Sequence, residues 1–421
     1  MYDAIVIGAR CAGSPTAMLL ARKGYRVLLV DKAGFPSDTL SVHYIHQPGV
    51  ALLKRWGLLD RIVASNCPPV LQLALDLGPF ALAGTPPPAD GVAEGYAPRR
   101  TVLDHILVEA AVEAGAELRE HFSMEELVTD GERVVGIRGR AAGGAKVTEQ
   151  ARMVIGADGM RSRVARGVQA PTYNGRPSLT CAYFSYWSGV PIEGVELYAR
   201  PDRMIVAVPT NDEQTAIIAY WLNAAFHEVR ADIEGNFLKA LDLAPSLAER
   251  VRSGQRTERF RGTADLPNFY RKSNGPGWAL VGDAGYHKDP ITAQGITDAF
   301  RDAEFLAEAF DDGSTGRRTF EDALANHEQR RNEASLPLYE LTCELATLQP
   351  PSLEQQQLFA ALRHNQAQTN GFFGTLAGTV PFPEFYSPDN VGRIMGAAGS
   401  MEAVNMPDTG PLFSESAGVP I

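Results

Sequence analysis

The sequence predicts an α/β chain, α+β over its whole length, in which a mainly antiparallel sheet is inserted into a parallel one. Three observations carry this prediction. The first thirty residues read strand, turn, helix, strand, which is the order of a unit with parallel strands. Strand-like runs then follow one another between residues 177 and 222 without helices, as in an antiparallel sheet. The α/β pattern returns near residue 277, and helix-prone segments extend the chain toward its carboxyl end.

The composition is that of a globular chain rather than a disordered one. Of the 421 residues, 45% are hydrophobic and 21% are charged, and at about 150 residues per domain they predict two or three domains. The net charge of −11, without a local basic patch, disfavours nucleic acid and anionic membrane surfaces as partners. No apolar run reaches the roughly 18 residues that a membrane span requires. The apolar segment 4–21 follows Asp3 and contains Arg10, which argues against a signal peptide.

Cysteine usage is typical of a reducing compartment, and we expect a cytoplasmic protein. The spacing contains no Cys-x-x-Cys pair, so neither a disulfide framework nor a metal site is expected. The four cysteines are Cys11, Cys67, Cys181 and Cys343.

The first predicted unit has clear boundaries. Residues 2–7 form an apolar run of strand length, and residues 26–30 form a second run of the same kind. Between them, residues 13–23 have a helical pattern, and Gly24 follows as a residue suited to end a helix.

The later elements follow from hydrophobic period and turn residues. Beyond residue 362 the chain is rich in Gly and Pro, and we expect a frayed tail after Met406. Helices are expected over residues 47–62, 101–114, 228–252 and 296–310. Strands are expected over residues 133–139, 147–157, 181–187, 195–198, 203–208, 215–222 and 277–281.

The first strand ends in a glycine-rich turn that opens the first helix. A bound pyrophosphate requires backbone N–H groups at a helix N-terminus with no Cβ atoms in the way, which Gly8 and Gly13 provide. Arg10 stands where a second glycine is usual, and its guanidinium is suited to pair with a phosphate. Asp31 ends the second strand, where a carboxylate accepts hydrogen bonds from a ribose. Together these residues predict a Rossmann-like dinucleotide site, and a purely structural turn is the alternative.

Two further polar motifs follow predicted strands. Gly282 and Asp283 stand where a carboxylate can bind a ligand polyol, although a turn aspartate is the commoner use. After Pro290, Gly295 begins a helix whose N-terminus can approach a flat ligand and stabilise negative charge on it. The third motif, residues 156–163, is an Asp-Gly turn with a basic rim, and a solvated turn is the alternative.

In order, spacing and strand-end context, the three motifs resemble those of the FAD-dependent monooxygenase superfamily typified by para-hydroxybenzoate hydroxylase, which includes geranylgeranyl-reductase-like and halogenase branches. The resemblance covers roughly residues 1–345. It implies that the first motif binds the ADP half of FAD, that the Asp-Gly motif serves FAD and the pyridine nucleotide, and that the Gly-Asp motif holds the ribityl chain. Arg100, three residues before a Leu-Asp pair, matches an arginine that contacts the cofactor. The residues expected to bind FAD are Gly8, Arg10, Gly13, Asp31, Lys32, Arg100, Asp158, Gly159, Gly282, Asp283, Pro290, Gly295 and Ile296.

The resemblance also implies a reaction. NADPH or NADH reduces the flavin as a transient co-substrate, dioxygen adds to give a flavin C4a-hydroperoxide, and an aromatic or polyketide-like small molecule is hydroxylated. The alternative enzyme is a flavin-dependent reductase or dehydrogenase of the geranylgeranyl-reductase type, acting on carbon–carbon double bonds. A non-catalytic flavoprotein is the alternative outside enzymes. A halogenase is disfavoured because the sequence contains no Trp-x-Trp-x-Ile-Pro segment.

Histidines and aromatic residues are the candidates for contact with the substrate. Imidazole titrates near neutral pH and suits acid–base work, and aromatic side chains suit a pocket for a flat ligand. Ordinary packing in the core is the alternative for each of these residues. The candidates for catalysis are His43, His46 and His287. The candidates for substrate binding are Tyr183, Trp187 and Tyr220.

The predicted domains are discontinuous. Substrate identity, preference between NADH and NADPH, oligomeric state and the role of the extension stay open at this stage. The expected FAD-binding domain comprises residues 1–78, 99–176 and 263–345, the substrate domain residues 79–98 and 177–262, and the carboxy-terminal extension residues 346–421.

Overall fold

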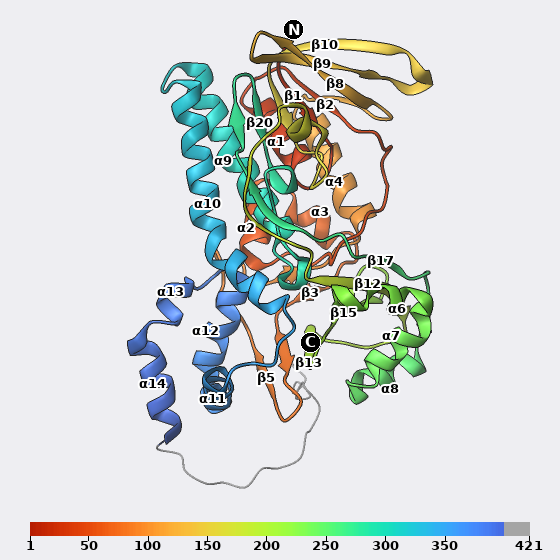
Figure 1. The fold of residues 1–421 in the computed structure, drawn as a ribbon, viewed down its shortest axis with the longest axis vertical. Coiled ribbons are helices and arrows are strands. Elements are labelled where there is room, and N and C mark those ends of the chain that lie inside the picture. Colours follow the sequence, from red (N-terminus) through yellow and green to blue (C-terminus); the bar gives the residue numbers. More distant parts are fainter. Residues whose placement is uncertain (400–421) are drawn as a thin grey trace.

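The structure is a computed structural model that describes residues 1–399, and the tail expected after Met406 lies outside these residues. The molecule is elongated, with the first sheet near one end and the second sheet near the other (Figure 1). Two long helices, α9 and α10, run along one side of the first sheet, and the carboxy-terminal helices lie beside the second (Figure 1). Within residues 1–399, no helix is long and apolar enough to cross a membrane.

The first sheet has the expected parallel core. Its strand order is β19-β20-β10-β1-β2-β7, and every neighbouring pair from β20 to β7 is parallel. The register sets Ile7, Gly156 and Leu280 side by side at the ends of β1, β10 and β20. The three motif loops therefore leave the same edge of the sheet from three adjacent strands, which is where open parallel sheets bind ligands. The strands are β1 (Tyr2–Ile7), β2 (Val27–Val30), β7 (Glu117–Arg119), β10 (Lys146–Gly156), β19 (Asn274–Gly275) and β20 (Trp278–Leu280).

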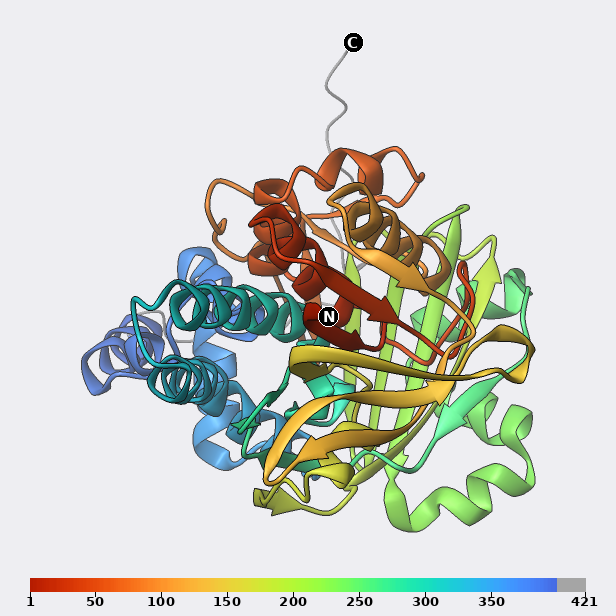
Figure 2. The ribbon, with the colours of Figure 1, turned by 90° about the horizontal axis from the view of Figure 1, so that it is seen from above.

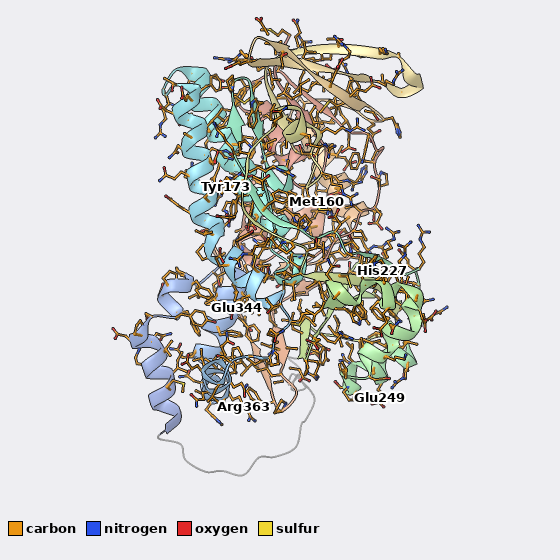
Figure 3. All side chains as sticks on the ribbon, in the orientation of Figure 1. Met160, Tyr173, His227, Glu249, Glu344 and Arg363 are labelled. Carbon is orange, nitrogen blue, oxygen red and sulfur yellow. The ribbon has the colours of Figure 1, made fainter. Side chains whose placement is uncertain are left out.

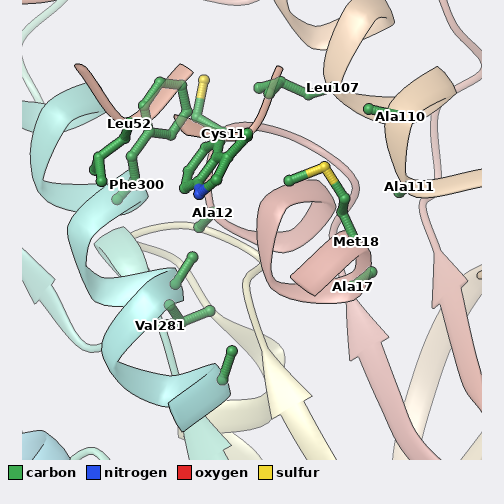
Figure 4. Close-up of a cluster of buried hydrophobic side chains, with 14 of the residues drawn as sticks. Cys11, Ala12, Ala17, Met18, Leu52, Leu107, Ala110, Ala111, Val281 and Phe300 are labelled. Carbon is green, nitrogen blue, oxygen red and sulfur yellow. The ribbon is translucent and has the colours of Figure 1, made fainter. Parts of the chain in front are cut away.

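Helices cover one face of this sheet with closely packed small residues. Cys11, Ala17 and Met18 of the first turn and helix meet Ala110 and Ala111 of α4, and Phe300 of α9 lies nearby (Figure 4). The alanines allow the helix backbones to approach closely. The helices are α1 (Gly13–Arg22), α4 (Arg100–Glu113) and α9 (Gly295–Thr315).

The helix expected over residues 47–62 is two helices, α2 (Gln47–Arg55) and α3 (Leu59–Val63). Gly57 separates them with a φ of 76°, and its N–H donates to the carbonyl of Lys54. A left-handed glycine of this kind ends a helix, whereas hydrophobic period alone continues it.

A hairpin extends the first sheet beyond its parallel core. The strands β8 (Ser123–Asp130) and β9 (Arg133–Arg140) pair with each other, and β9 pairs antiparallel with the first half of β10. Figure 2 shows this ribbon crossing above the second sheet when the molecule is seen from above.

The second sheet is mainly antiparallel, as expected. Its order is β16-β12-β15-β14-β13-β4-β5, and only β13 and β4 are parallel neighbours. The strand β4 comes from residues that we assigned to the first domain, because its short apolar run carries no signal of its partner. The strands are β4 (Leu73–Asp76), β5 (Ala81–Gly84), β12 (Thr180–Ser188), β13 (Val195–Arg200), β14 (Arg203–Thr210), β15 (Gln214–Leu222), β16 (Gln255–Arg256) and β17 (Arg261–Thr263), the last of which pairs with β12.

The single helix expected over residues 228–252 is three helices that cover one face of the second sheet. Asp232 accepts the N–H of Gly235 as the cap of the second helix, and Pro245 begins the third. Both residues restart a helix rather than continue one. The helices are α6 (Phe226–Ala231), α7 (Ile233–Leu241) and α8 (Pro245–Ser253).

Helices continue to the end of the described chain, as expected for the carboxy-terminal extension, and three of them lie within the Gly- and Pro-rich region after residue 362. The helix α12 packs against β5, and its Phe372 and Phe373 join the core of the second sheet. A small third sheet has the strand order β11-β18-β21. These elements are β11 (Thr172–Arg176), β18 (Asn268–Arg271), β21 (Tyr286–His287), α10 (Phe320–Leu345), α11 (Leu353–Leu362), α12 (Gln366–Ala377), α13 (Phe382–Phe385) and α14 (Pro388–Gly399).

Candidate active site

A cavity of about 960 Å³ joins the loop edge of the first sheet to one face of the second sheet. Met160, labelled in Figure 3, lies on its wall in this middle region of the molecule. The cavity brings together all but one of the residues expected to bind the cofactor. These are Gly8, Arg10, Asp31, Lys32, Arg100, Asp158, Gly159, Gly282, Asp283, Pro290, Gly295 and Ile296.

The glycine turn after β1 is packed too tightly for other residues. Gly8 has a φ of +104°, and a Cβ atom there would lie 2.4 Å from the carbonyl oxygen of Ala157. Gly13, the expected residue that does not line the cavity, would place a Cβ atom 1.7 Å from the carbonyl oxygen of Gly8. Its role in the structure is thus to let α1 approach the turn.

Asp31 holds this turn at its base. One carboxylate oxygen accepts the N–H of Ala9 at 2.7 Å, and the other accepts the N–H of Ala33 at 2.8 Å. Each oxygen keeps a lone pair, because an ionised carboxylate can accept about four hydrogen bonds. The carboxylate is therefore oriented and still able to accept ribose hydroxyl groups.

Two arginines on the cavity wall share one buried carboxylate. Arg10 lies 2.5 Å from Asp104 and also donates to the hydroxyl of Ser37 at 2.9 Å. Arg100 donates to Asp104 through Nε at 3.0 Å and through Nη2 at 2.9 Å. Because Asp104 is fully buried and balances one of the two positive charges, the pair keeps a net positive charge suited to a pyrophosphate.

The Gly-Asp motif after β20 is held by a hydrogen bond to α9, through residues that the sequence analysis did not predict for the site. The N–H of Gly282 donates to Asp302 of α9 at 2.8 Å, and the other oxygen of Asp302 lies 2.7 Å from Nε2 of the buried His327. Asp283 is exposed to the cavity and makes no side-chain hydrogen bond within residues 1–399. A carboxylate left free beside this turn fits the hydroxyl groups of a ribityl chain.

Open space at two glycines completes the fit to a flat, elongated cofactor. A Cβ atom built on Gly295, at the start of α9, would meet no atom within 4 Å, and the same holds for Gly159. Both glycines line the cavity, so the space in front of their backbones belongs to it. The N-terminus of α9 begins at this wall of the cavity, and the N-terminus of a helix favours negative charge.

The three candidate histidines have different environments. His287 lines the cavity, donates through Nδ1 to the carbonyl of Pro267, and stacks on Phe269 with ring centroids 5.8 Å apart. Since a carbonyl only accepts, Nδ1 carries the proton and Nε2 of the neutral ring carries the lone pair. Nε2 has no hydrogen-bond partner within the described residues.

His43 lines the cavity with a strained backbone, and His46 does not reach the cavity. His43 has a φ of 66°, and its Nε2 lies 2.6 Å from the hydroxyl of Tyr186. Burial, aided by Arg100 and Arg99, lowers the pKa of His43 to about 3, so its ring is neutral. His46 is buried in the wall, where Nε2 donates to the carbonyl of Thr292 at 3.1 Å and burial lowers its pKa to about 4.

The three candidate aromatic residues lie on opposite faces of the second sheet. Tyr220 lines the cavity. Tyr183 and Trp187 face the helices instead, where Trp187 stacks on Phe237 with centroids 5.6 Å apart. Successive side chains of β12 point to opposite faces, so Phe184, one residue from Tyr183, lines the cavity in its place. Tyr183 and Trp187 therefore do not line the cavity, contrary to expectation. Both faces of β12 carry aromatic residues, and the sequence does not distinguish the two faces.

A buried charged segment between the Gly-Asp motif and α9 was also missed. Lys288 forms an ion pair with Asp298, which also pairs with Arg301 at 2.5 Å. Asp289 accepts the hydroxyl of Thr180 at 2.5 Å, and burial raises the pKa of Asp289 to about 6. The available signal was the run of three consecutive polar residues, 287–289, between the Gly-Asp motif and the predicted helix at 296.

Comparison with known proteins agrees with this geometry. A family model described as an FAD binding domain matches residues 1–336. A digeranylgeranylglycerophospholipid reductase of Methanocella arvoryzae is 27% identical over 315 residues, which cover 71% of this chain and 74% of that protein. The structure of the myxobacterial chondrochloren halogenase CndH aligns with a TM-score of 0.76 at 22% identity, over 94% of this chain and 96% of that chain. PqsL, a probable FAD-dependent monooxygenase from Pseudomonas aeruginosa, aligns with a TM-score of 0.68 at 20% identity, over 88% and 99% of the two chains.

The two structural alignments support the fold, and the family match supports the cofactor. The expectations of an α/β FAD-binding fold, of FAD as the cofactor and of an oxidoreductase are confirmed. NAD(P)H is the co-substrate typical of such enzymes. The chain belongs to the FAD binding domain family, and it is a flavin-dependent oxidoreductase.

Proposed function

We propose that the protein is an FAD-dependent monooxygenase that uses NAD(P)H and dioxygen to hydroxylate an aromatic or polyketide-like small molecule. One observation carries this proposal. The cavity continues from the dinucleotide groove into a chamber with an apolar wall, where the carbonyl of Pro267 holds the ring of His287 through Nδ1 and leaves Nε2 without a partner among residues 1–399.

The chamber suits a flat ligand that must be kept from water. Its wall is formed by the cavity-facing side of the second sheet and by the segment before α2, and the ring of His43 meets Phe184 edge to face at 6.2 Å. An apolar wall excludes water and favours aromatic rings. The apolar residues on this wall are Val42, Ala182, Phe184, Ile218, Leu266 and Ala293.

We assign acid–base work to His287. When bound, FAD supplies the transfer of electrons from NAD(P)H and the activation of dioxygen. The carbonyl of Pro267 holds the ring with its lone pair on Nε2. Nε2 then accepts the proton of a substrate hydroxyl as the ring carbon becomes electron-rich. His43 is neutral at all ordinary pH values and serves to hold the substrate rather than to carry charge.

The cofactor roles and the domain division belong to the same proposal. Gly8 and Asp31 bind the ADP half, Arg10 and Arg100 face the pyrophosphate, and Asp283 binds the ribityl chain. We retain the proposed FAD-binding, substrate and carboxy-terminal domains, with β4 moved to the substrate domain. The four buried, unpaired cysteines support a reducing, cytoplasmic location.

The test measures NAD(P)H oxidation by the FAD-loaded protein with a panel of phenols and polyketide-like aromatics. We expect an active compound to stimulate oxidation and to gain one oxygen atom from labelled dioxygen. The variant His287→Asn keeps a donor toward Pro267 but loses the basic nitrogen, so product formation should fall about 100-fold or more while FAD binding is kept. Stimulated oxidation without oxygen in the product would overturn the hydroxylase assignment.

A reductase acting on carbon–carbon double bonds is the second candidate. The relative from Methanocella arvoryzae, a digeranylgeranylglycerophospholipid reductase, favours it. Turnover of an isoprenoid alkene with a reductant under strict anaerobiosis would support this reaction over hydroxylation. Halogenation, suggested by the fold of CndH, would instead require a halide and leave it in the product.

A further inference from the structure

The turn that precedes α9 is held in place by the carboxy-terminal helices. This turn, residues 290–294, makes two side-chain contacts with helices far along the chain. Thr292 bonds the hydroxyl of Thr342 on α10 at 2.8 Å. Gln294 donates through Nε2 to the carbonyl of Leu376 on α12 at 2.6 Å, and Gln294 is 1% exposed.

Gln294 connects the end of one helix to the beginning of another. The carbonyl of Leu376 belongs to the last turn of α12, where carbonyl groups have no partner inside the helix. The side chain of Gln294 supplies the missing donor. The backbone carbonyl of Gln294 accepts the N–H of Asp298 at 2.9 Å, which forms the first hydrogen bond of α9.

The turn forms part of the wall of the cofactor cavity. Pro290, Ala293 and Gly295 all line the cavity. Ala293 has a φ of 54°, a left-handed conformation that a non-glycine residue keeps only when its surroundings hold it. Gln294 directly follows this residue and directly precedes the open backbone of Gly295.

We propose that the carboxy-terminal helices position bound FAD, with Gln294 as the positioning residue. The carbonyl of Leu376 fixes Gln294, and Gln294 fixes the turn and the N-terminus of α9 against the cofactor. The extension thus acts on the cofactor site across a sequence distance of 82 residues.

The test compares Gln294→Met with a control on α12, the helix that contains Leu376. The control is Asn370→Ala. Methionine keeps the length of glutamine and loses the donor. Asn370 holds the other part of α12 by accepting the N–H of Thr85 at 3.0 Å, away from the cavity. We expect both variants to melt at a lower temperature. Only Gln294→Met should raise the dissociation constant of FAD, by about two- to tenfold, and change the shape of the visible absorption band of the bound flavin.

A second variant covers the case in which Gln294→Met fails to fold. In Gln294→Glu a protonated carboxyl can donate to the carbonyl of Leu376, whereas an ionised one cannot. We expect its FAD affinity, relative to the wild type at each pH, to recover as the pH is lowered. Equal FAD affinity and spectra in Gln294→Met and Asn370→Ala, or no recovery in Gln294→Glu, would overturn the proposal. No measurement requires a substrate, so the outcome is independent of the proposed hydroxylation.

Discussion

At the scale of single residues, Asp289 is a buried acid. It is 1% exposed, and its carboxylate accepts the hydroxyl of Thr180 at 2.5 Å and the N–H of Ile291 at 3.1 Å. Burial raises its pKa to about 6, although these two hydrogen bonds oppose the rise. The two donors orient the carboxyl group at the start of the turn that Gln294 closes.

This raised pKa predicts how stability depends on pH. The unfolded chain releases the proton near pH 3.9, whereas the folded protein keeps it to about pH 6. Between these values the folded state binds more protons, so the contribution of Asp289 to the free energy of unfolding falls as pH rises. We expect the wild type to lose on the order of 3 kcal/mol across this window relative to Asp289→Asn, which does not titrate. Urea unfolding of both proteins at several pH values measures the difference, and a difference independent of pH would contradict the shifted pKa.

At the scale of elements, strand β12 separates two environments. Its alternate residues Ala182, Phe184 and Tyr186 pack on the cavity side, and Tyr183 and Trp187 pack on the helices. The pleat of the strand fixes this alternation. One set of aromatic residues therefore faces the cavity, and the other set, of similar chemistry, packs in the core against the helices.

A pair of truncations tests the two faces of β12. Trp187→Ala removes a ring stacked on Phe237 and should lower the free energy of unfolding by about 3–5 kcal/mol. It should leave ligand binding in the chamber unchanged. Phe184→Ala should weaken the binding of an aromatic ligand by about 1–2 kcal/mol, because the ligand loses an apolar wall. Titration with ligand and urea unfolding give both quantities, and an equal loss of ligand affinity in the two variants would refute the assignment of faces.

At the scale of the whole molecule, the cavity lies between the two large sheets and is lined by residues of both. The cofactor groove is made by loops from β1, β10 and β20, and the chamber by β12 and β15 of the other sheet. A ligand that fills such a cavity contacts both sheets and stabilises the folded state that binds it.

Removal of FAD should therefore lower the stability of the entire protein. At FAD concentrations about 100 times its dissociation constant, binding contributes about 2.7 kcal/mol. We expect the melting temperature to fall on removal and to recover with FAD but not with riboflavin, which lacks the ADP half assigned to Gly8 and Asp31. Thermal melts of the stripped and reconstituted protein measure this. Full recovery with riboflavin would contradict a role for the glycine turn in binding.

Several features of this protein follow from the sequence because they depend on local geometry. The turn at Gly8 requires a left-handed backbone, and Asp31 ends a strand whose position the apolar run already defines. Such signals predicted the α/β fold, and all but one of the residues expected to bind FAD line the cavity. Helix breaks at Gly57 and Asp232 were missed because an apolar stripe continues across them.

The sequence by itself determined the class of fold and the order of the motifs along the chain, since hydrophobic period and turn residues are local patterns, and the resemblance of these motifs to a known family implied the cofactor. Only the tertiary structure decided which face of β12 meets the cavity, that His287 and His43 line it while His46 does not, and that Gln294 bonds Leu376 of α12. These outcomes depend on which strands pair and how helices pack across tens or hundreds of residues. Short-range patterns of hydrophobicity and turn residues do not predict which distant strands pair or which distant helices pack together.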